Sequence, residues 1–422
     1  MSKKIFAVIA IFCGMMGIAQ KNNSSPYSYF GIGDPLTLKS VEEMSMGRIG
    51  VSNDSPFQLS LTNPASYGSL LYTTYVFSGG NKMTNFEDGN DTQTSSHAGF
   101  TYLALGIPLG ENQGMAFGLQ LNTSVGYSLL SYSLDEEENI IQVDEFEGSG
   151  GTNRVFLGYG YKFPFGLSLG AETAYIFGSL DNSIRNRRLG IQLATKYRVD
   201  SWVDGFEFKT GAQYTAPLAN ELKLKLGVSA VLGNDLTEDS DEVLYSINNT
   251  PSNNEIIIDT LYTNNYRSTI TFPLKTVLGG GVGKENVWFA GIEYEWMDAI
   301  SLEGDFYDQQ TTYQYTESSR LSLGGSFIPN FNAISNYWQR IEYRAGFSYK
   351  KLGLTITDTA LNDYGITFGV GLPVGFQLSR VNLGFELGTR GENKDNLVKE
   401  NYFNFRLSLS LSDKWFRKRE LY

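Results

Sequence analysis

The chain has little of the chemistry on which most metal and catalytic sites depend. Cys13 is its only cysteine, so neither an intramolecular disulfide nor a cysteine-based zinc cluster can form. His97 is its only histidine, which leaves a metal centre without a histidine pair. Only 18% of the residues are charged and the formal net charge is −12, whereas nucleic-acid phosphates call for a basic surface. The composition therefore argues against metal-dependent chemistry and against nucleic-acid binding.

Long apolar runs are also missing beyond the N-terminus, which excludes a helical membrane protein. Residues 1–19 are typical of a cleaved secretory signal, because Lys3 and Lys4 precede a short apolar run and Ala19 closes a small-residue cleavage site. Cys13 is expected to leave with this signal peptide. A lipidated Cys13 is the alternative, although the two bulky residues before it fit that modification poorly.

What the chain does contain is glycine and aromatic residues, with 46 Gly, 26 Tyr and 27 Phe among 422 residues, and this favours one large β structure. Residues 402–411 alternate cleanly, with Phe403, Leu407 and Leu409 on one face and Arg406 and Ser408 on the other. Such runs reach about 10 residues, the length that a tilted strand needs to cross a membrane. Since every backbone polar group must be paired in hydrocarbon, the pattern predicts a closed barrel.

Fifteen strand-like runs can be placed, and they cover 69–78, 98–108, 115–132, 154–163, 167–178, 189–199, 206–215, 222–232, 268–282, 287–297, 319–328, 340–350, 363–373, 380–389 and 400–411. An odd number conflicts with a single-chain bacterial barrel. We place the error in 189–232, where three runs are joined by the short connections 200–205 and 216–221. The runs at 69–78 and 400–411 are predicted to pair and close the barrel.

The connections between these runs fall into two length classes. Short ones are predicted to be periplasmic turns, namely 109–114, 164–166, 283–286 and 373–375. Long ones are predicted to be external loops, namely 133–153, 233–267 and 298–318. The first two loops are acidic, but no calcium-loop spacing occurs and a solvated charged loop is the simpler interpretation. Aromatic residues on the outward faces, such as Trp288, are expected to mark the membrane interfaces.

Residues 20–68 follow no sustained period, although they contain many apolar residues that favour burial. They include the segment "MGRIGV", with Gly47 and Gly50, and end on "NPAS", with Asn63, Pro64 and Ala65. This order resembles the N-terminal region of the FadL family of outer-membrane barrels, the long-chain fatty acid transporters and their relatives. Residues 25–34 resemble the start of the Bacteroidetes branch of that family. A flexible periplasmic leader is the alternative for residues 20–68.

The resemblance implies an all-β fold, a transmembrane antiparallel β-barrel of about 14 strands. It divides the chain into a signal peptide (1–19), an N-terminal plug segment in the lumen (20–68) and an outer-membrane barrel (69–422). It also implies a location in the outer membrane of a Gram-negative cell, contact with membrane lipid, and no cofactor. Gly47, Gly50, Asn63, Pro64 and Ala65 are the candidate plug-to-barrel motif.

An enzyme is not expected. His97 stands beside Ser96 in a predicted loop, but sequence neighbours rarely have the geometry of nucleophile and base. Glu293 and Glu295 share one face of a strand and could act as a carboxylate pair. Because basic residues such as Arg344 are also predicted to face the lumen, structural ion pairing is the simpler account.

Two functions remain. The first is a FadL-like uptake channel for hydrophobic small molecules. The second is a non-transporting barrel subunit of an outer-membrane protein secretion or assembly complex, a role that some Bacteroidetes relatives of FadL play. An apolar route to a side opening in the wall would favour the first, and an occluded lumen with an exposed protein-binding ledge would favour the second. For the last strand, we expect Leu407→Arg to be costly and Ser408→Arg to be tolerated.

Overall fold

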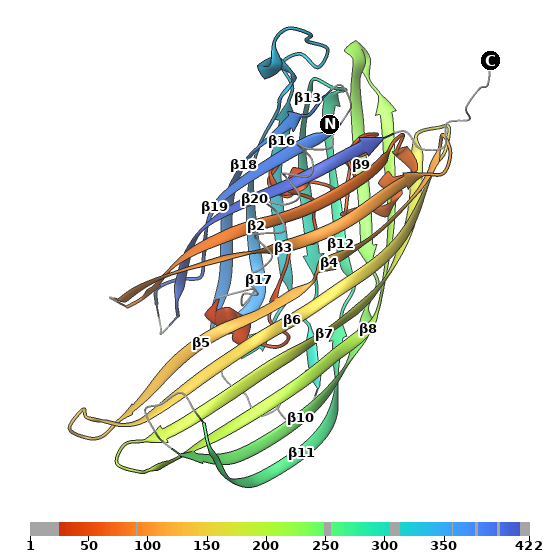
Figure 1. The fold of residues 1–422 in the computed structure, drawn as a ribbon. Coiled ribbons are helices and arrows are strands. Elements are labelled where there is room, and N and C mark those ends of the chain that lie inside the picture. Colours follow the sequence, from red (N-terminus) through yellow and green to blue (C-terminus); the bar gives the residue numbers. More distant parts are fainter. Residues whose placement is uncertain are drawn as a thin grey trace.

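The strands form one antiparallel sheet that closes into a barrel (Figure 1). The computed structural model describes residues 25–89, 91–248, 255–303, 313–356, 358–375, 379–394 and 397–413. β2 (Thr73–Asp88) pairs with β20 (Lys399–Asp413) along its length, from Thr73 opposite Asp413 to Glu87 opposite Lys399. The predicted closure of the barrel by its first and last strands is therefore confirmed. The predicted signal peptide, residues 1–19, lies outside the described residues.

The remaining wall strands are β3 (Asp91–Pro108), β4 (Gln113–Leu121), β5 (Thr123–Leu134), β6 (Ile140–Lys162), β7 (Leu167–Arg188), β8 (Leu193–Pro217), β9 (Leu222–Val231), β10 (Asn234–Asn248), β11 (Ile257–Phe272), β12 (Lys275–Lys284), β13 (Trp288–Met297), β14 (Ser301–Glu303), β15 (Tyr313–Tyr315), β16 (Ser318–Phe327), β17 (Glu342–Ile356), β18 (Thr359–Pro373) and β19 (Arg380–Arg390). Five consecutive pairs each follow one another along the wall as a single interrupted strand: β4–β5, β9–β10, β11–β12, β13–β14 and β15–β16. Counted in this way, the described residues form a closed barrel of 14 strands, and the predicted number is confirmed.

The strand number in 189–232, where we placed the error, is settled by the length of β8. This strand has 25 residues and runs without interruption through 200–205, where Asp200 lies opposite Asp181 of β7 and Asp241 of β10. The predicted connection at 200–205 is wrong, whereas the chain does turn between β8 and β9, at 218–221. Two of the fifteen runs are thus one strand, which restores an even number.

Two of the predicted external loops are largely strand. Residues 234–248 and 257–272 pair as β10 and β11, so the prediction of a loop at 233–267 is wrong. Likewise, β5 and β6 pair across most of 133–153 and leave a short turn that begins at Asp135. His97 lies within β3 opposite Lys82, not in a loop. The third predicted loop, 298–318, lies partly outside the described residues.

The strands of one side of the barrel are much longer than a membrane requires. β6 has 23 residues, each adding roughly 3.3 Å to its length. A tilted strand needs only about 9 to 11 residues to cross a membrane, so β6 is about twice as long as that. The short turns and the end of β20 lie at one end of the barrel, which we assign to the periplasm, and the long hairpins extend from the other. The hairpins therefore continue into water outside the cell.

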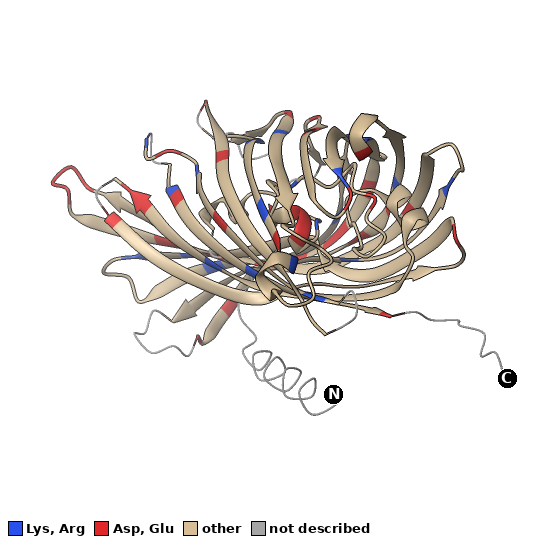
Figure 2. Ribbon diagram, turned by 90° about the horizontal axis from the view of Figure 1, so that it is seen from above, with Lys and Arg blue, Asp and Glu red and all other residues tan. Residues whose placement is uncertain are grey.

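The polarity of the two faces inverts along these strands. Near the periplasmic end of β8 the exposed residues are Phe206 and Phe208, and the buried ones include Lys209. Farther along, Arg198 lies on the outside, whereas Val203 is buried in an apolar cluster and Val199 is also buried. The first arrangement suits hydrocarbon outside and a polar lumen, and the second suits water outside and an apolar interior. Figure 2 shows the charged residues distributed along the wall and on the long hairpins.

The wall is split between β3 and β5. β3 pairs with β4 from Tyr102 to Pro108, but from Asp91 to Phe100 its pairing is with β2. No pairing joins β5 to β3 among the residues that the structure describes; instead Thr123 and Ser124 pair with β1 (Asp34–Pro35) of the N-terminal segment. The two hairpins diverge from this point (Figure 1).

The N-terminal segment, residues 25–72, lies against the inward-facing side chains of the wall. It contains η1 (Pro26–Tyr29), β1, α2 (Val41–Met44) and η2 (Pro64–Ser69), and residues 39–52 are buried throughout. A capping box at Ser40 and Glu43 fixes the start of α2. Within the described residues, no helix has both the length and the apolar character needed to span a bilayer.

Candidate functional site

The "NPAS" motif docks on glycines of the wall. Asn63 donates through Nδ2 to the carbonyl oxygens of Val51 at 2.8 Å and Ala212 at 3.1 Å, and its Oδ1 accepts from the amide of Ala65 at 3.0 Å. Asn63 therefore fastens the N-terminal segment to β8 while it caps η2, whose first residue is Pro64. A Cβ on Gly211 would lie 1.9 Å from Asn63 Oδ1, which explains why the wall carries glycine there.

The "MGRIGV" motif makes equally close contacts on another part of the wall. Gly47 has a φ of +66° and donates its amide to Thr367 Oγ1 at 2.8 Å; a Cβ there would lie 2.4 Å from the carbonyl oxygen of Leu323. Gly50 donates its amide to Glu293 Oε2 at 2.8 Å. Both glycines thus bring the backbone of the N-terminal segment within hydrogen-bonding distance of wall side chains.

Buried ion pairs fill much of the space between the segment and the wall. Arg48 bonds Glu386 at 2.5 Å, and Lys39 pairs with Glu293. Glu295, the second member of the predicted carboxylate pair, pairs with Lys275 at 3.1 Å. The interpretation of Glu293 and Glu295 as structural ion-pair partners is therefore confirmed. An unpaired charge in this interior would be costly, so these contacts define one position of the segment.

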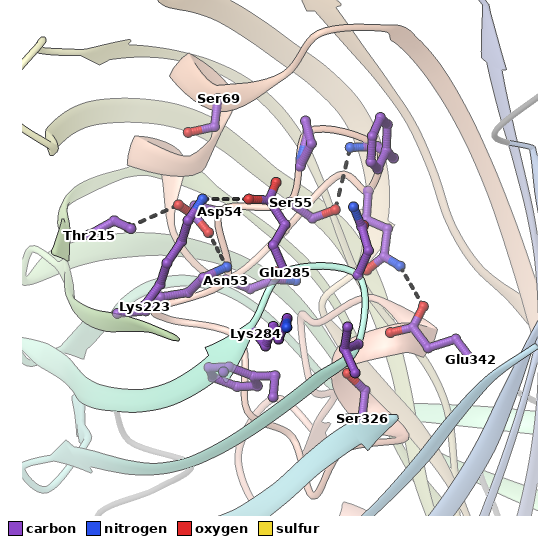
Figure 3. Close-up of a pocket in the computed structure, with 18 of the residues that line it drawn as sticks. Asn53, Asp54, Ser55, Ser69, Thr215, Lys223, Lys284, Glu285, Ser326 and Glu342 are labelled. Atoms are coloured by element: carbon purple, nitrogen blue, oxygen red, sulfur yellow. Dashed lines mark hydrogen bonds and ion pairs between the residues drawn. The ribbon is translucent and has the colours of Figure 1, made fainter. Parts of the chain in front are cut away.

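At the periplasmic mouth, a polar pocket of about 320 Å³ lies beneath residues 53–58 of the segment (Figure 3). Asp54 accepts from Thr215 Oγ1 at 2.9 Å and pairs with Lys225. Gln58 Nε2 donates to Glu342 Oε2 at 3.0 Å on the other side of the pocket. The segment is thus fastened to the wall on both sides of this pocket, and charged groups surround the mouth.

A second cavity, of about 220 Å³, lies deeper, between the N-terminal segment and the wall, and its lining is predominantly apolar. It touches β1 and the break at Asn122 and Thr123, so it reaches the point at which the wall splits. The apolar residues that line it include Phe30, Ile32, Leu36, Leu38, Ile270, Ile300, Leu302 and Leu354. No sequence pattern predicts this set, because its members are far apart in the chain and meet only in the folded barrel.

The polar residues at this cavity include both basic and acidic side chains, and these form ion pairs. Arg320 Nη1 lies 3.4 Å from Glu295 Oε2, and Lys209 Nζ lies 2.8 Å from Glu172 Oε1. Lys350 also lines the cavity. The cavity thus combines apolar walls with a few charged groups, which is the usual composition of a small-molecule site.

The acidic turn at Asp135 has a structural role. Its Oδ1 accepts from the amides of Asn139 at 2.8 Å and Glu137 at 2.9 Å, which closes the β5–β6 turn. The bonds from Asn139 hold the pKa of Asp135 below its ordinary value. Among the described residues no group of three or more His, Cys, Asp or Glu could hold a metal ion. The Asp135 carboxylate thus serves to close a turn of the backbone.

Comparisons with known proteins place the chain in a family. The BamG family profile matches residues 1–421. The chain belongs to the BamG family. A comparison with curated proteins gave no match.

Several solved structures of low sequence identity are similar to this BamG-family chain. The toluene transporter TodX of Pseudomonas putida is 13% identical with a TM-score of 0.61, over 90% of this chain and 100% of its own. The CymD monoaromatic hydrocarbon channel is 14% identical with a TM-score of 0.56, over 90% and 98%. A Pseudomonas aeruginosa FadL homologue is 12% identical with a TM-score of 0.55, over 90% and 98%. The fold is thus that of a FadL-like outer-membrane β-barrel, as the resemblance implied.

Proposed function

We propose that this protein is an outer-membrane uptake channel for hydrophobic small molecules. The observation that carries the proposal is the apolar cavity beside the split between β3 and β5. A hydrophobic molecule could leave the cavity sideways past β1, without crossing the charged periplasmic mouth. The titles of the similar structures, a toluene transporter and a monoaromatic hydrocarbon channel, agree with this class of ligand.

The size of the cavity limits the range of ligands that can fit. A dry cavity of roughly 150 Å³ binds benzene in a well-studied case, and this one measures about 220 Å³. A single aromatic ring with a few further carbons fits, whereas a long fatty acid requires movement of the N-terminal segment. We expect monoaromatic compounds to be taken up faster than long-chain fatty acids.

Filling the cavity tests this function. Leu302→Trp places a larger side chain in the cavity, whereas Ile292→Trp adds the same bulk on the outward face of β13, where Ile292 is exposed. Uptake of radiolabelled toluene is measured in a deletion strain that expresses either variant or the parent chain. We expect Leu302→Trp to lower the rate several-fold and Ile292→Trp to leave it unchanged. Equal uptake with and without the protein would contradict the proposal.

Several further features are proposed with it. Residues 20–68 act as the lumen plug, with Gly47, Gly50, Asn63, Pro64 and Ala65 as the plug-to-barrel motif, and residues 1–19 are removed as a signal peptide when the protein reaches the outer membrane. The opening residues 25–34 support a place in the Bacteroidetes branch. The protein is not an enzyme in this proposal, and the membrane lipid is its surroundings.

The second candidate is a non-transporting barrel subunit of a secretion or assembly complex. The buried ion pairs of Lys39, Arg48 and Arg154 favour it, because they occupy the lumen with groups that a hydrophobic ligand would have to pass. Unchanged toluene uptake on deletion, together with recovery of outer-membrane partners by the tagged protein, would support this role in place of transport.

A further inference from the structure

The connection between β16 and β17 is unlike the other described periplasmic turns. It covers residues 328–341, whereas the β6–β7 turn covers only 163–166. Figure 1 shows a connection with a short helix, which matches η4 (Tyr337–Arg340), projecting from the periplasmic end of the barrel. Strand pairing does not require this length, since four residues suffice between β6 and β7. We name residues 328–341 the periplasmic ledge.

Hydrogen bonds give the ledge a fixed shape. The amide of Asn330 donates to the carbonyl oxygen of Gln339 at 2.8 Å, and the amide of Trp338 donates to Asn336 Oδ1 at 3.1 Å. The hydroxyl of Tyr337 donates to the carbonyl oxygen of Pro373 at 3.2 Å, which ties the ledge to the end of β18. A binding partner would therefore lose little free energy in ordering it.

This ordered ledge turns large apolar side chains outward. Ile334 is 100% exposed, Trp338 71% and Tyr337 45%. Trp and Tyr are the residue types most enriched among the energetic centres of protein interfaces. Their exposure on a fixed loop that projects from the barrel end is unfavourable in water, so a covering surface is expected.

The barrel wall continues this apolar surface. A groove of about 910 Å³ runs over the outer face of β13, β16 and β17, where the small residues Gly325 and Ala345 lie side by side in register. Tyr343 lines the groove, and its hydroxyl donates to the carbonyl oxygen of Trp338 on the ledge at 3.2 Å. Ledge and groove are therefore continuous.

The charge of the ledge is opposite to that of the chain. Residues 328–341 contain Arg340 and no Asp or Glu, whereas the chain has a formal net charge of −12. Arg340 is half-buried at the end of η4. A surface that matches the ledge therefore needs an apolar depression beside a carboxylate.

We propose that the periplasmic ledge is the docking site for a second protein on the periplasmic side of the outer membrane. The partner covers Ile334 and Trp338 with an apolar depression and places a carboxylate against Arg340. This interaction is independent of transport, because the ledge lies outside the lumen.

Cysteine labelling distinguishes a protein partner from membrane lipid. Ile334→Cys is compared with Phe165→Cys, which replaces a residue that is 65% exposed on the β6–β7 turn. Both are treated with a charged, water-soluble maleimide, first as purified protein in phospholipid nanodiscs and then in native outer membranes whose periplasmic face is open. We expect both to react rapidly in nanodiscs, and labelling at position 334 alone to slow several-fold in native membranes.

Each other outcome overturns part of the proposal. Slow labelling at position 334 in nanodiscs means that lipid covers the ledge. Equal rates at position 334 in nanodiscs and native membranes mean that nothing docks there. Combining Ile334→Cys with Arg340→Glu should restore rapid labelling in native membranes, and protection that survives this change overturns the carboxylate contact.

Discussion

At the scale of single residues, buried charges decide where the N-terminal segment and the wall meet. Arg154 is 1% exposed, and it donates to Glu172 at 2.9 Å, Glu207 at 2.7 Å and Gln120 at 2.7 Å. Tyr67 of the segment donates to the second oxygen of Glu172 at 2.7 Å. The segment thus shares one polar network with four wall strands, β4, β6, β7 and β8, and the loss of one member leaves the others buried with fewer partners.

Arg154→Met should destabilise the barrel by about 3 to 5 kcal/mol, because Glu172 then keeps a buried charge with less compensation. Arg198→Met removes a cation of the same kind from the exposed pair with Asp181, where the expected loss is about 0 to 1 kcal/mol. Urea unfolding in lipid vesicles, followed by tryptophan fluorescence, measures both. Equal losses would contradict the assignment of Arg154 to a structural network.

At the scale of strands, the alternation of apolar and polar residues is enough to predict a strand wherever one face of that strand lies in hydrocarbon. The side chains of residues 402–411 alternate between the two faces as predicted. Leu407 and Leu409 face the lipid, whereas Ser408 and Ser410 are buried inside the barrel. In 200–205 and 233–267 the strand continues into water, so outward Asp and Arg residues imitate a loop. The sequence reports polarity, and the height of each residue relative to the membrane decides what that polarity means.

The candidate site was less predictable than the strands. Gly47, Gly50 and Asn63 stood out by their order in the chain, and the structure supplies their contacts. The apolar cavity, by contrast, joins residues such as Ile32, Ile270 and Leu354, whose proximity depends on barrel closure. Ser408 shows the same limit, since it is fully buried and accepts from Asn382 Nδ2 at 3.2 Å. This burial argues against the expected tolerance of Ser408→Arg, because Asn382 in turn donates to Glu42 of the segment and leaves little room for an arginine there.

Two arginine substitutions at different depths in the membrane test where the outward face of a strand leaves the hydrocarbon. Leu407→Arg should cost about 2 to 4 kcal/mol, because the cation lies in hydrocarbon near the midplane. Trp202→Arg also faces outward, but it lies between Asp200 and Asp204 beyond the apolar band, where about 0 to 1 kcal/mol is expected. Both are compared by reversible unfolding in lipid vesicles. Similar costs would mean that β8 does not leave the membrane at this height.

At the scale of the whole molecule, the barrel and its N-terminal segment depend on each other. Glycines of four wall strands, Gly114, Gly160, Gly170 and Gly211, leave room for the backbone or side chains of residues 63–68. The wall is thus shaped for an occupant that the same chain supplies. A barrel with this lining and no segment would leave Glu293 without Lys39 and Glu386 with Arg406 but without Arg48, and water would have to enter the lumen.

Deletion of residues 20–68 should therefore convert a closed barrel into a water-filled pore. In planar bilayers we expect the parent protein to conduct weakly and the deletion variant to show a clearly larger single-channel conductance. A milder variant, Asn63→Ala, removes the hydrogen bonds to Val51 and Ala212 while it keeps the segment, and brief openings are expected. If the deletion variant inserts as a folded barrel and its conductance equals that of the parent, the segment does not block the lumen in the membrane, and the proposed plug role is wrong.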